Sequence, residues 1–206
     1  MLIQKRIREG IYKPGEKLVE TRLCKELSVS QAPVREAFLE LAIMGLLEER
    51  PYSGTFVRSV RPEEISDIYN IRAFIEEYAV RRACTNENEE ALREIEETVN
   101  KMEQCESRED FVELDRDFHE GVLRASGSSA LQKCWNSLQV TQWTYQSILN
   151  TKKSLKQLAA EHREILDIML SKQDHTAGAI MFLHIRGFAE EITEFMNEPG
   201  QAKAEN

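Results

Sequence analysis

Three of the four histidines lie on apolar faces of predicted helices, and one of them has an aspartate one helical turn away. Asp115 and His119 are four residues apart in VELDRDFHEGVL, so their side chains share one helix face. His162 in LAAEHREILDIM and His184 in AIMFLHIRGFA also stand in register with apolar residues. Because buried polar groups need partners, one divalent metal ion would serve all four side chains at once.

A single inward-facing histidine is more often a hydrogen-bonded core residue than a metal ligand. A group of such polar residues on separate helices is harder to explain in that way, yet the residues alone leave both interpretations open. His175 lies in the helix break QDHTAG, so we expect it at the surface or at a helix cap and leave it out of the cluster.

The segment that carries these residues has the pattern of an all-helical domain. From residue 62 onward there are no strand patterns, and an apolar periodicity of 3.6 residues continues through the segment. Six helices with short connections predict an antiparallel bundle over residues 61–198, followed by a disordered tail at 199–206. The helices are expected near residues 62–84, 87–105, 107–126, 129–149, 152–172 and 174–197.

Residues 1–60 have a different pattern. Two predicted helices, 19–27 and 31–44, are separated by a tight turn in which Ser30 is the expected N-cap. The stretches LLEER and TFVRSV then predict two short strands around a turn at PYSG. The fold expected for the whole chain is therefore mainly α, with an N-terminal winged helix-turn-helix and a C-terminal helical bundle.

The second helix of a helix-turn-helix enters the major groove of DNA, where its first residues face the bases. An arginine there can pair with guanine and a glutamine with adenine. The alternative is an amphipathic helix whose polar face is only solvated. The candidate DNA contacts are Ser30, Gln31, Ala32 and Arg35 on the second helix, Thr21, Arg22 and Lys25 on the first, and Ser53, Gly54 and Thr55 at the wing tip.

Charge is unevenly distributed along the 206 residues, whose formal net charge is −9. Residues 1–60 carry ten Lys and Arg against eight Asp and Glu, whereas residues 61–206 carry a net charge of −11. Contact with a polyanion is therefore expected in the N-terminal part. We expect a cytoplasmic protein without a membrane span or secretory signal, since no apolar run approaches ~20 residues. The four cysteines form no CxxC pair and are interpreted as reduced thiols.

The order and spacing of PGEKL, VSQAPVREAFLEL, GLLEER and SGTFV resemble the DNA-binding domain of the GntR family of bacterial regulators over residues 2–60. Two positions depart from the family pattern, since Gln31 stands where arginine is usual and Ala32 where threonine is frequent. We therefore expect a different operator consensus, with Arg35 in the family position as the principal contact. The family's first helix usually begins earlier, which implies a missing N-terminal extension or a misplaced start.

The spacings DxxxH, EHxxIL and MxxHI, together with SDIYNIRAFIEEYAVRRA, resemble the FCD effector domain of the FadR-like branch of that family. This resemblance implies that Asp115, His119, His162 and His184 hold a metal that in turn binds a small carboxylate effector. Zinc is the expected ion, with nickel, manganese and iron as alternatives. Arg72, the family's arginine in IYNIRAFIE, is implied as the partner of the carboxylate. The alternative for Arg72 is a surface ion pair with Glu76.

These patterns predict a ligand-responsive transcription regulator that binds a palindromic operator as a homodimer. One alternative is a metalloenzyme built on a helical bundle and acting on a small organic acid. The paired ExxH motifs of di-iron enzymes and the HExxH motif of zinc proteases are both absent, which argues against it. A second alternative is an architectural protein that uses the winged helix for protein contacts.

Overall fold

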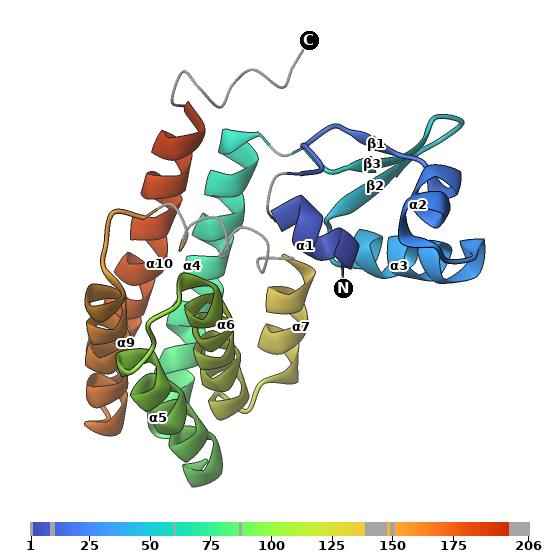
Figure 1. Cartoon of the computed structure of the whole chain (residues 1–206). Helices are drawn as coiled ribbons and strands as arrows, with labels where there is room; N and C mark the ends of the chain where they lie inside the picture. The colour runs from blue at the N-terminus through green and yellow to red at the C-terminus, as the bar shows by residue number, and fades with distance from the viewer. Residues whose placement is uncertain are drawn as a thin grey trace. The chain divides into compact units, whose positions relative to one another are not determined.

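In the computed structural model, the described part of the chain forms two compact units (Figure 1). One lies within Met1–Arg61 and the other within Pro62–Asn197. The described residues are 2–8, 11–59, 61–86, 88–138, 148 and 151–197. Among them, helices predominate and the strands fall in the N-terminal unit, which confirms the predicted fold class.

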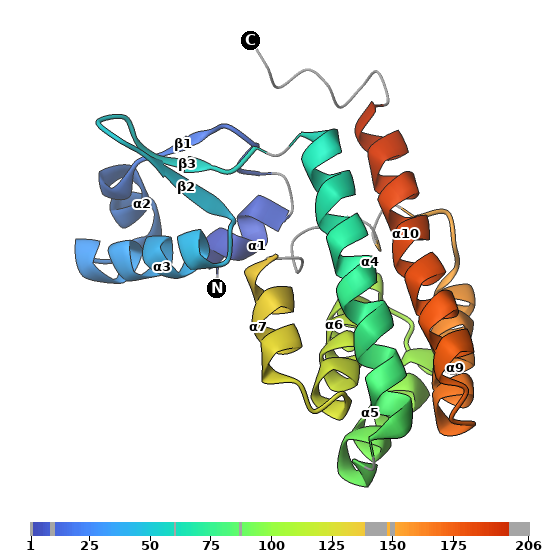
Figure 2. The same ribbon diagram turned by 180° about the vertical axis from the view of Figure 1, so that it is seen from behind.

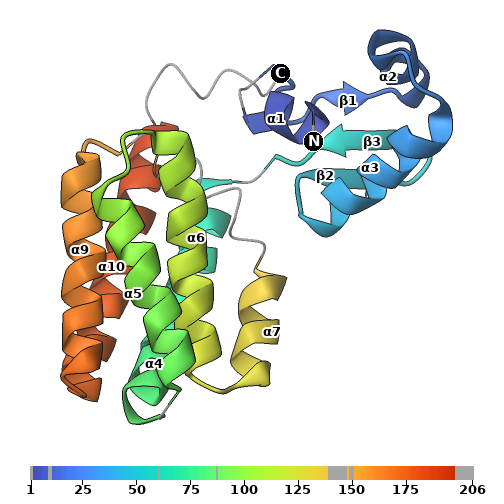
Figure 3. The ribbon, with the colours of Figure 1, turned by 60° about the horizontal axis from the view of Figure 1, so that its bottom comes forward.

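The N-terminal unit is a set of three helices with a small antiparallel sheet. Its strands are arranged in the order β1-β3-β2, with β3 in the middle (Figure 3). The chain passes through α1 (Leu2–Arg8), β1 (Lys17–Leu18), α2 (Glu20–Leu27), α3 (Gln31–Ile43), β2 (Leu47–Arg50) and β3 (Gly54–Val57). Strand β1 was not predicted, because two residues are too few to show an alternating pattern.

The turn between α2 and α3 depends on Ser28, which adopts the left-handed conformation with φ 55°. This reversal of the chain places apolar residues of both helices in one core, which contains Leu23, Val34 and Leu41. Ser30 occupies the N-cap position of α3 as predicted, but its hydroxyl makes no capping hydrogen bond. The first turn of α3 therefore keeps its N–H groups for other acceptors.

The C-terminal unit is a bundle of helices with short connections. Its helices are α4 (Pro62–Thr85), α5 (Glu89–Glu103), α6 (Arg108–Ala125), α7 (Ser129–Ser137), α9 (Leu155–Leu170) and α10 (Asp174–Asn197). Their bounds agree with the predicted ones to within three residues, except that the helix expected over 129–149 is described as α7 only as far as Ser137. Residues 139–147 and 149 of that prediction, and the predicted tail, lie outside the described residues.

Side-chain caps determine where several of these helices begin. The side chains of Asn88, Ser107 and Ser128 each accept a hydrogen bond from a first-turn N–H of α5, α6 and α7, respectively. Ser154 and Gln157 form a reciprocal capping box at the start of α9. These caps fix the helix starts and hence which residues each helix directs into the bundle.

Helices α4 and α10 run antiparallel and side by side (Figures 1 and 2). The C-terminal turn of α4 meets the N-terminal turn of α10, where Arg81 lies 4.0 Å from Asp174. None of the described helices is long and apolar enough to cross a membrane.

Candidate metal centre and nucleic-acid interface

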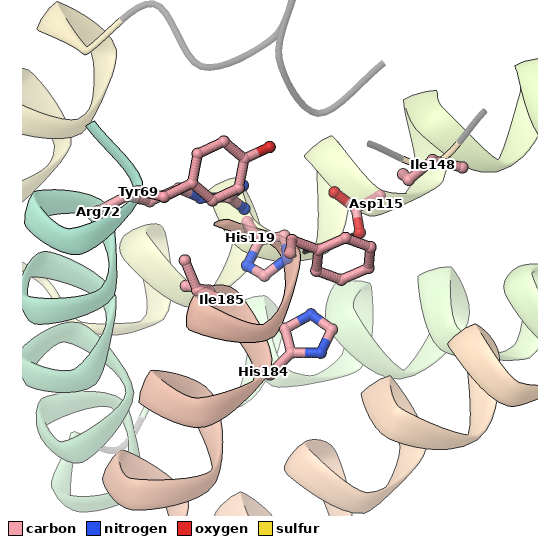
Figure 4. Close-up of a pocket in the computed structure, with 8 residues that line it drawn as sticks. Tyr69, Arg72, Asp115, His119, Ile148, His184 and Ile185 are labelled. Carbon is pink, nitrogen blue, oxygen red and sulfur yellow. Dashed lines mark ion pairs between the residues drawn. The ribbon is translucent and has the colours of Figure 1, made fainter. Parts of the chain in front are cut away.

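A cluster of buried polar side chains lies inside the bundle of the C-terminal unit. Helix α6 contributes Asp115 and His119, α9 contributes His162, and α10 contributes His184. One ligand atom from each lies within 4.8 Å of the others. The structure thus brings together the four residues that the sequence singled out, and Figure 4 shows three of them around a cavity.

Each of the three imidazoles contacts an acceptor outside the cluster through its Nδ1 atom. The contacts are His119 with Glu76 Oε2 (2.5 Å), His162 with the Leu158 carbonyl (2.8 Å) and His184 with Glu161 Oε2 (3.2 Å). A neutral imidazole that donates through Nδ1 keeps a lone pair on Nε2. Such outward hydrogen bonds are the usual way in which proteins orient metal-binding histidines.

Two buried nitrogens are left without a hydrogen-bond partner among the described residues, namely His162 Nε2 and His184 Nε2. The first lies 3.1 Å from Asp115 Oδ1, and His119 Nε2 lies 3.7 Å from the same oxygen. With its proton on Nδ1, His162 faces the carboxylate as one acceptor against another. Such a contact is repulsive unless a metal cation or a second proton on the ring lies between the two atoms.

The donor set suits a divalent ion. Three imidazole nitrogens and one carboxylate oxygen are ligands for Zn²⁺, and also for Ni²⁺, Mn²⁺ or Fe²⁺. Ligand atoms about 2.1 Å from a shared ion lie at most ~4.2 Å apart. The cluster, spanning 4.8 Å, would need to contract by only about half an ångström.

The electrostatics of the cluster favour the protonation states that metal binding needs at Asp115 and His184, but oppose the neutral ring at His119. Burial alone would raise the pKa of Asp115, but His119 and His162 hold it well below its ordinary value. Burial, together with the neighbouring rings, lowers the pKa of His184 to about 4, so this ring is neutral near pH 7. Burial opposes the charged form of His119 as well, yet the Glu76 carboxylate raises the pKa of that ring.

Glu76 connects the cluster to α4, and sequence reasoning missed its role. Its Oε1 accepts hydrogen bonds from Arg72 Nε and Trp135 Nε1, both at 2.6 Å, while Oε2 contacts His119. Burial would raise the pKa of Glu76, but Arg72 and His119 lower it to about 2. The spacing of Tyr69, Arg72 and Glu76 along one face of α4 was the available signal.

The alternative of a surface ion pair for Arg72 is wrong about its location. The pair with Glu76 exists, but the side chains are only 4% and 0% exposed.

Glu161 is a second residue that sequence reasoning missed. It contacts His184 and pairs with Lys153 at 2.8 Å. Burial opposes this carboxylate, but its partners, His184 first, lower its pKa to about 2. His175, by contrast, is 81% exposed and lies outside the cluster, as expected.

A cavity of about 10 Å³ adjoins the cluster (Figure 4). Its lining consists of Tyr69, Arg72, Asp115, His119, Ile148, His184, Ile185 and Phe188. A cavity needs roughly 10–15 Å³ to hold one water molecule. In this conformation the site therefore has room for an ion or a water molecule but not for an organic acid.

The predicted recognition residues lie on the surface of α3. Gln31 and Ala32 are exposed in its first turn. Arg35 is exposed one turn later, where its Nε donates to Glu20 Oε2 on α2 at 2.8 Å. A DNA contact by Arg35 must therefore compete with this ion pair.

The remaining predicted contacts are also accessible. Thr21, Arg22 and Lys25 line an open depression on α2. At the wing tip, Ser53 and Gly54 are exposed and Thr55 is half-buried. Sequence reasoning missed Tyr52, which is fully exposed with a left-handed φ of 60°. An exposed aromatic side chain held in this way at a wing tip is a candidate contact to DNA.

Comparison with known families finds two matches. The pattern of the FCD domain matches residues 67–187, and that of bacterial regulatory proteins of the gntR family matches residues 1–57. Among solved structures, E. coli McbR/YncC is similar, with a TM-score of 0.71 and 22% identity over 93% of this chain and 92% of that chain.

Curated relatives are similar along most of their length. The probable D-xylose utilization operon transcriptional repressor of Paenarthrobacter nicotinovorans is 30% identical, over 88% of this chain and 81% of that protein. The Nta operon transcriptional regulator of Aminobacter aminovorans is 28% identical, over 90% and 88%. The gluconate operon transcriptional repressor of Bacillus subtilis is 28% identical, over 80% and 68%.

Proposed function

The chain belongs to the GntR family of bacterial regulatory proteins and carries an FCD domain, and from this premise we propose that it is a ligand-responsive regulator whose effector site depends on a metal ion. Like its named relatives, it is a transcriptional regulator and not an enzyme. The metalloenzyme alternative is therefore rejected. The proposal includes a homodimer, a palindromic operator and a cytoplasmic location.

One observation carries the metal site. The orphaned Nε2 atoms of His162 and His184 lie buried beside the Asp115 carboxylate. Leaving a buried acceptor unsatisfied costs ~1–3 kcal/mol. Binding of a metal ion by these two nitrogens would offset that cost. Asp115, His119, His162 and His184 are the residues that would hold the ion.

The charges of the site support an anionic effector. With the three rings neutral, as metal ligation requires, Asp115, Glu76 and Arg72 sum to a net charge of −1. A bound divalent ion supplies a net positive site and an electrophilic anchor for carboxylate oxygens. Arg72 lines the same cavity and pairs with Glu76 through Nε, and its guanidinium is the partner proposed for the carboxylate. One relative is named for the operon of gluconate, which is itself a small carboxylate.

The size of the cavity supports a change of conformation on effector binding. At about 10 Å³ it is too small for any organic acid, so its walls must move apart for the effector to enter. A ligand that binds only the enlarged arrangement shifts the population toward that arrangement. Apart from Ile148, the walls come from α4, α6 and α10, which therefore respond first.

The N-terminal unit supports operator binding through α3. Its first turn carries open N–H groups and the positive end of the helix dipole, which favour a phosphate. Gln31 and Arg35 are exposed and can reach base edges. Two such helices in a homodimer would read the two halves of a palindrome.

The metal proposal is tested by elemental analysis of purified variants. Asp115→Asn keeps the shape of the side chain, and His162→Ala removes one nitrogen. We expect both variants to lose bound metal and effector response while basal operator binding stays within twofold of the wild type. His175→Ala, which alters an exposed histidine outside the cluster, is the matched control. Wild-type metal content in both cluster variants would refute the ligand assignment.

The DNA proposal is tested with an operator selected from random sequence by the wild-type protein. Arg35→Ala should weaken binding to that operator by ~1–3 kcal/mol and relax the preference at one position of each half-site. Unchanged affinity and preference would show that α3 does not read the bases through Arg35.

A further inference from the structure

Two of the three cluster histidines contact carboxylates that differ in how firmly they are held. Glu76, which contacts His119, is fully buried and accepts two further hydrogen bonds from described side chains. Glu161, which contacts His184 Nδ1 at 3.2 Å, has a side chain that is 32% exposed. A carboxylate that reaches the solvent can exchange a protein partner for water at little cost, whereas a buried one cannot. The orientation of His184 is therefore the more adjustable of the two.

Lys153 holds Glu161 against His184. Its Nζ lies 2.8 Å from Glu161 Oε1, while the second oxygen of the same carboxylate faces the imidazole. A carboxylate that accepts from Nδ1 keeps the ring proton on that atom and leaves the Nε2 lone pair facing the cluster. Because His184 Nε2 has no hydrogen-bond partner among the described residues, that lone pair is open to an ion.

Lys153 belongs to a segment that is fastened to the bundle at several points. We call this segment, Thr151–Ser154, the pre-α9 segment because it leads into α9. The Thr151 hydroxyl donates to Glu191 on α10, and Lys153 Nζ lies 3.8 Å from the same carboxylate. The Lys153 ammonium also lies 5.2 Å from the centre of the Phe188 ring. These contacts place a positive charge against a residue that lines the cavity.

Arg108 connects the pre-α9 segment to the wall of the cavity. Its guanidinium donates to two backbone carbonyls, from Nη1 to Ile148 at 2.5 Å and from Nη2 to Lys153 at 2.6 Å. Ile148 is buried and lines the cavity beside the cluster (Figure 4). Because the planar guanidinium holds both carbonyls in one rigid fork, a displacement of Ile148 is transmitted to Lys153.

We propose that Lys153 and Glu161 act as a positioning pair, which keeps the lone pair of His184 directed into the metal cluster. Arg108 makes this pair respond to movement of the cavity wall. This coupling rests on the proposed function, in which the walls part when an effector enters. Outward movement of Ile148 draws Lys153 away from Glu161, which then loses the partner that holds it on His184. The ring is then free to carry its proton on Nε2, so that effector binding and metal affinity are coupled through one histidine.

Zinc affinity, measured by competition with a chelating dye on the metal-free full chain, tests the pair. Lys153→Met should weaken zinc binding by about fivefold, less than the ~10–100-fold that typically follows loss of an orienting partner itself. Lys153→Arg keeps the charge and should stay within twofold of the wild type. Lys152→Met is the matched control, because Lys152 is exposed in the same segment, and it should also stay within twofold. Circular dichroism verifies that each variant is folded. A Lys153→Met variant within twofold of the wild type would overturn the proposal.

The sign of the effect and a double-mutant cycle separate positioning from simple electrostatics. An ammonium repels a divalent cation, so a pure charge effect predicts tighter zinc binding in Lys153→Met, and that result would overturn the pair. If Lys153 acts through Glu161, Lys153→Met should cause no further loss in a Glu161→Gln background. Arg108→Lys keeps the charge but not the fork, and it should weaken zinc binding in the wild type but not in Lys153→Met. An equal loss in both backgrounds would overturn the role of Arg108.

Nitrogen chemical shifts of the His184 ring in metal-free protein test the positioning directly. The wild type should carry the ring proton on Nδ1, and Lys153→Met should move a measurable share of it to Nε2. Identical shifts in the two proteins would overturn the proposal. A wild type that binds no zinc but shows this change of tautomer would instead refute the proposed function and leave the positioning pair standing.

Discussion

Replacing Glu76 by glutamine is the sharpest test of how the cluster is held. Oε1 of Glu76 already accepts two N–H donors, from Arg72 and from Trp135. The amide oxygen of glutamine must take that position, so the amide NH₂ is forced toward His119 Nδ1. A donor at this point requires Nδ1 to be the acceptor, and the proton of His119 then moves to Nε2. The ring loses the lone pair that it directs into the cluster.

The magnitude follows from the two interactions that are lost. Removing the hydrogen bond that orients a metal-binding histidine typically costs 10–100-fold in metal affinity, or ~1.4–2.7 kcal/mol. Arg72 also loses the charge of its buried partner, and breaking a buried pair costs up to ~3–5 kcal/mol of stability. The retained amide oxygen still accepts from both donors, so we expect the lower end of that range for unfolding.

Metal affinity is measured by competition with a chelating dye on metal-free protein, and unfolding by urea titration. Nitrogen chemical shifts of His119 report its tautomer directly, which a merely structural change would not alter. Glu77→Gln on the same helix is the matched control, because Glu77 is half-exposed and its ion pair with Arg81 is long, at 3.7 Å. We expect the control to change neither quantity by more than ~0.5 kcal/mol. Wild-type metal affinity in Glu76→Gln would refute the argument that the proton on Nδ1 prepares the cluster.

Three further expectations follow from single contacts. Glu20→Gln frees Arg35 from an exposed ion pair worth ~0.2–1 kcal/mol. Operator affinity, measured by anisotropy titration, should therefore rise by up to about fivefold. A fall in affinity would contradict the argument that Glu20 and DNA compete for Arg35. Burial raises the pKa of Cys84 to about 11, so at pH 8 only about one thiol in a thousand is ionised. Iodoacetamide should then modify the exposed Cys134 well before Cys84, and equal labelling by mass mapping would contradict it. A methyl group on Gly121 would meet a side chain of α5 at 2.8 Å. Gly121→Ala should therefore lower the urea midpoint, because an overpacking cost of ~1–3 kcal/mol exceeds the gain of about 1 kcal/mol in helix propensity.

Much of the fold was predictable because the helices of the bundle are strongly periodic and clearly capped. The breaks around Ser107 and Ser154 contain the side chains that cap the following helices. The start of each of these helices is therefore determined by residues close to it in the sequence. The family resemblance predicted from the motifs is confirmed over both units. Strand β1 was missed because its pairing with β3 is determined by contacts between distant parts of the chain.

The cluster was predictable only in part. A spacing of four places Asp115 and His119 on one face, and apolar neighbours indicate that His162 and His184 point inward. That these residues meet depends on how α6, α9 and α10 pack, which periodicity does not determine. Glu76 was named only as the partner of Arg72 in the alternative of a surface ion pair. Exposed apolar residues such as Ile71 and Phe74 lie on the opposite face of α4, so the pattern does not show which face is inside.

The polar cluster lies inside the bundle, where an unsatisfied polar atom costs free energy. This cost indicates how a bound ion would affect the stability of the protein. Without a cation the bundle keeps two unsatisfied imidazole nitrogens at the point where α6, α9 and α10 meet, each costing ~1–3 kcal/mol. That layer therefore carries a cost in free energy that the apolar parts of the core do not. An ion bound there would join three helices through four side chains and, through Glu76, a fourth helix. Because a ligand that binds only the folded state adds RT ln(1 + [L]/Kd) to stability, metal at a hundred times its dissociation constant would add ~2.7 kcal/mol. The metal-free bundle should therefore be the looser state, and the sensor's response to its effector should be measured on the metal-loaded protein.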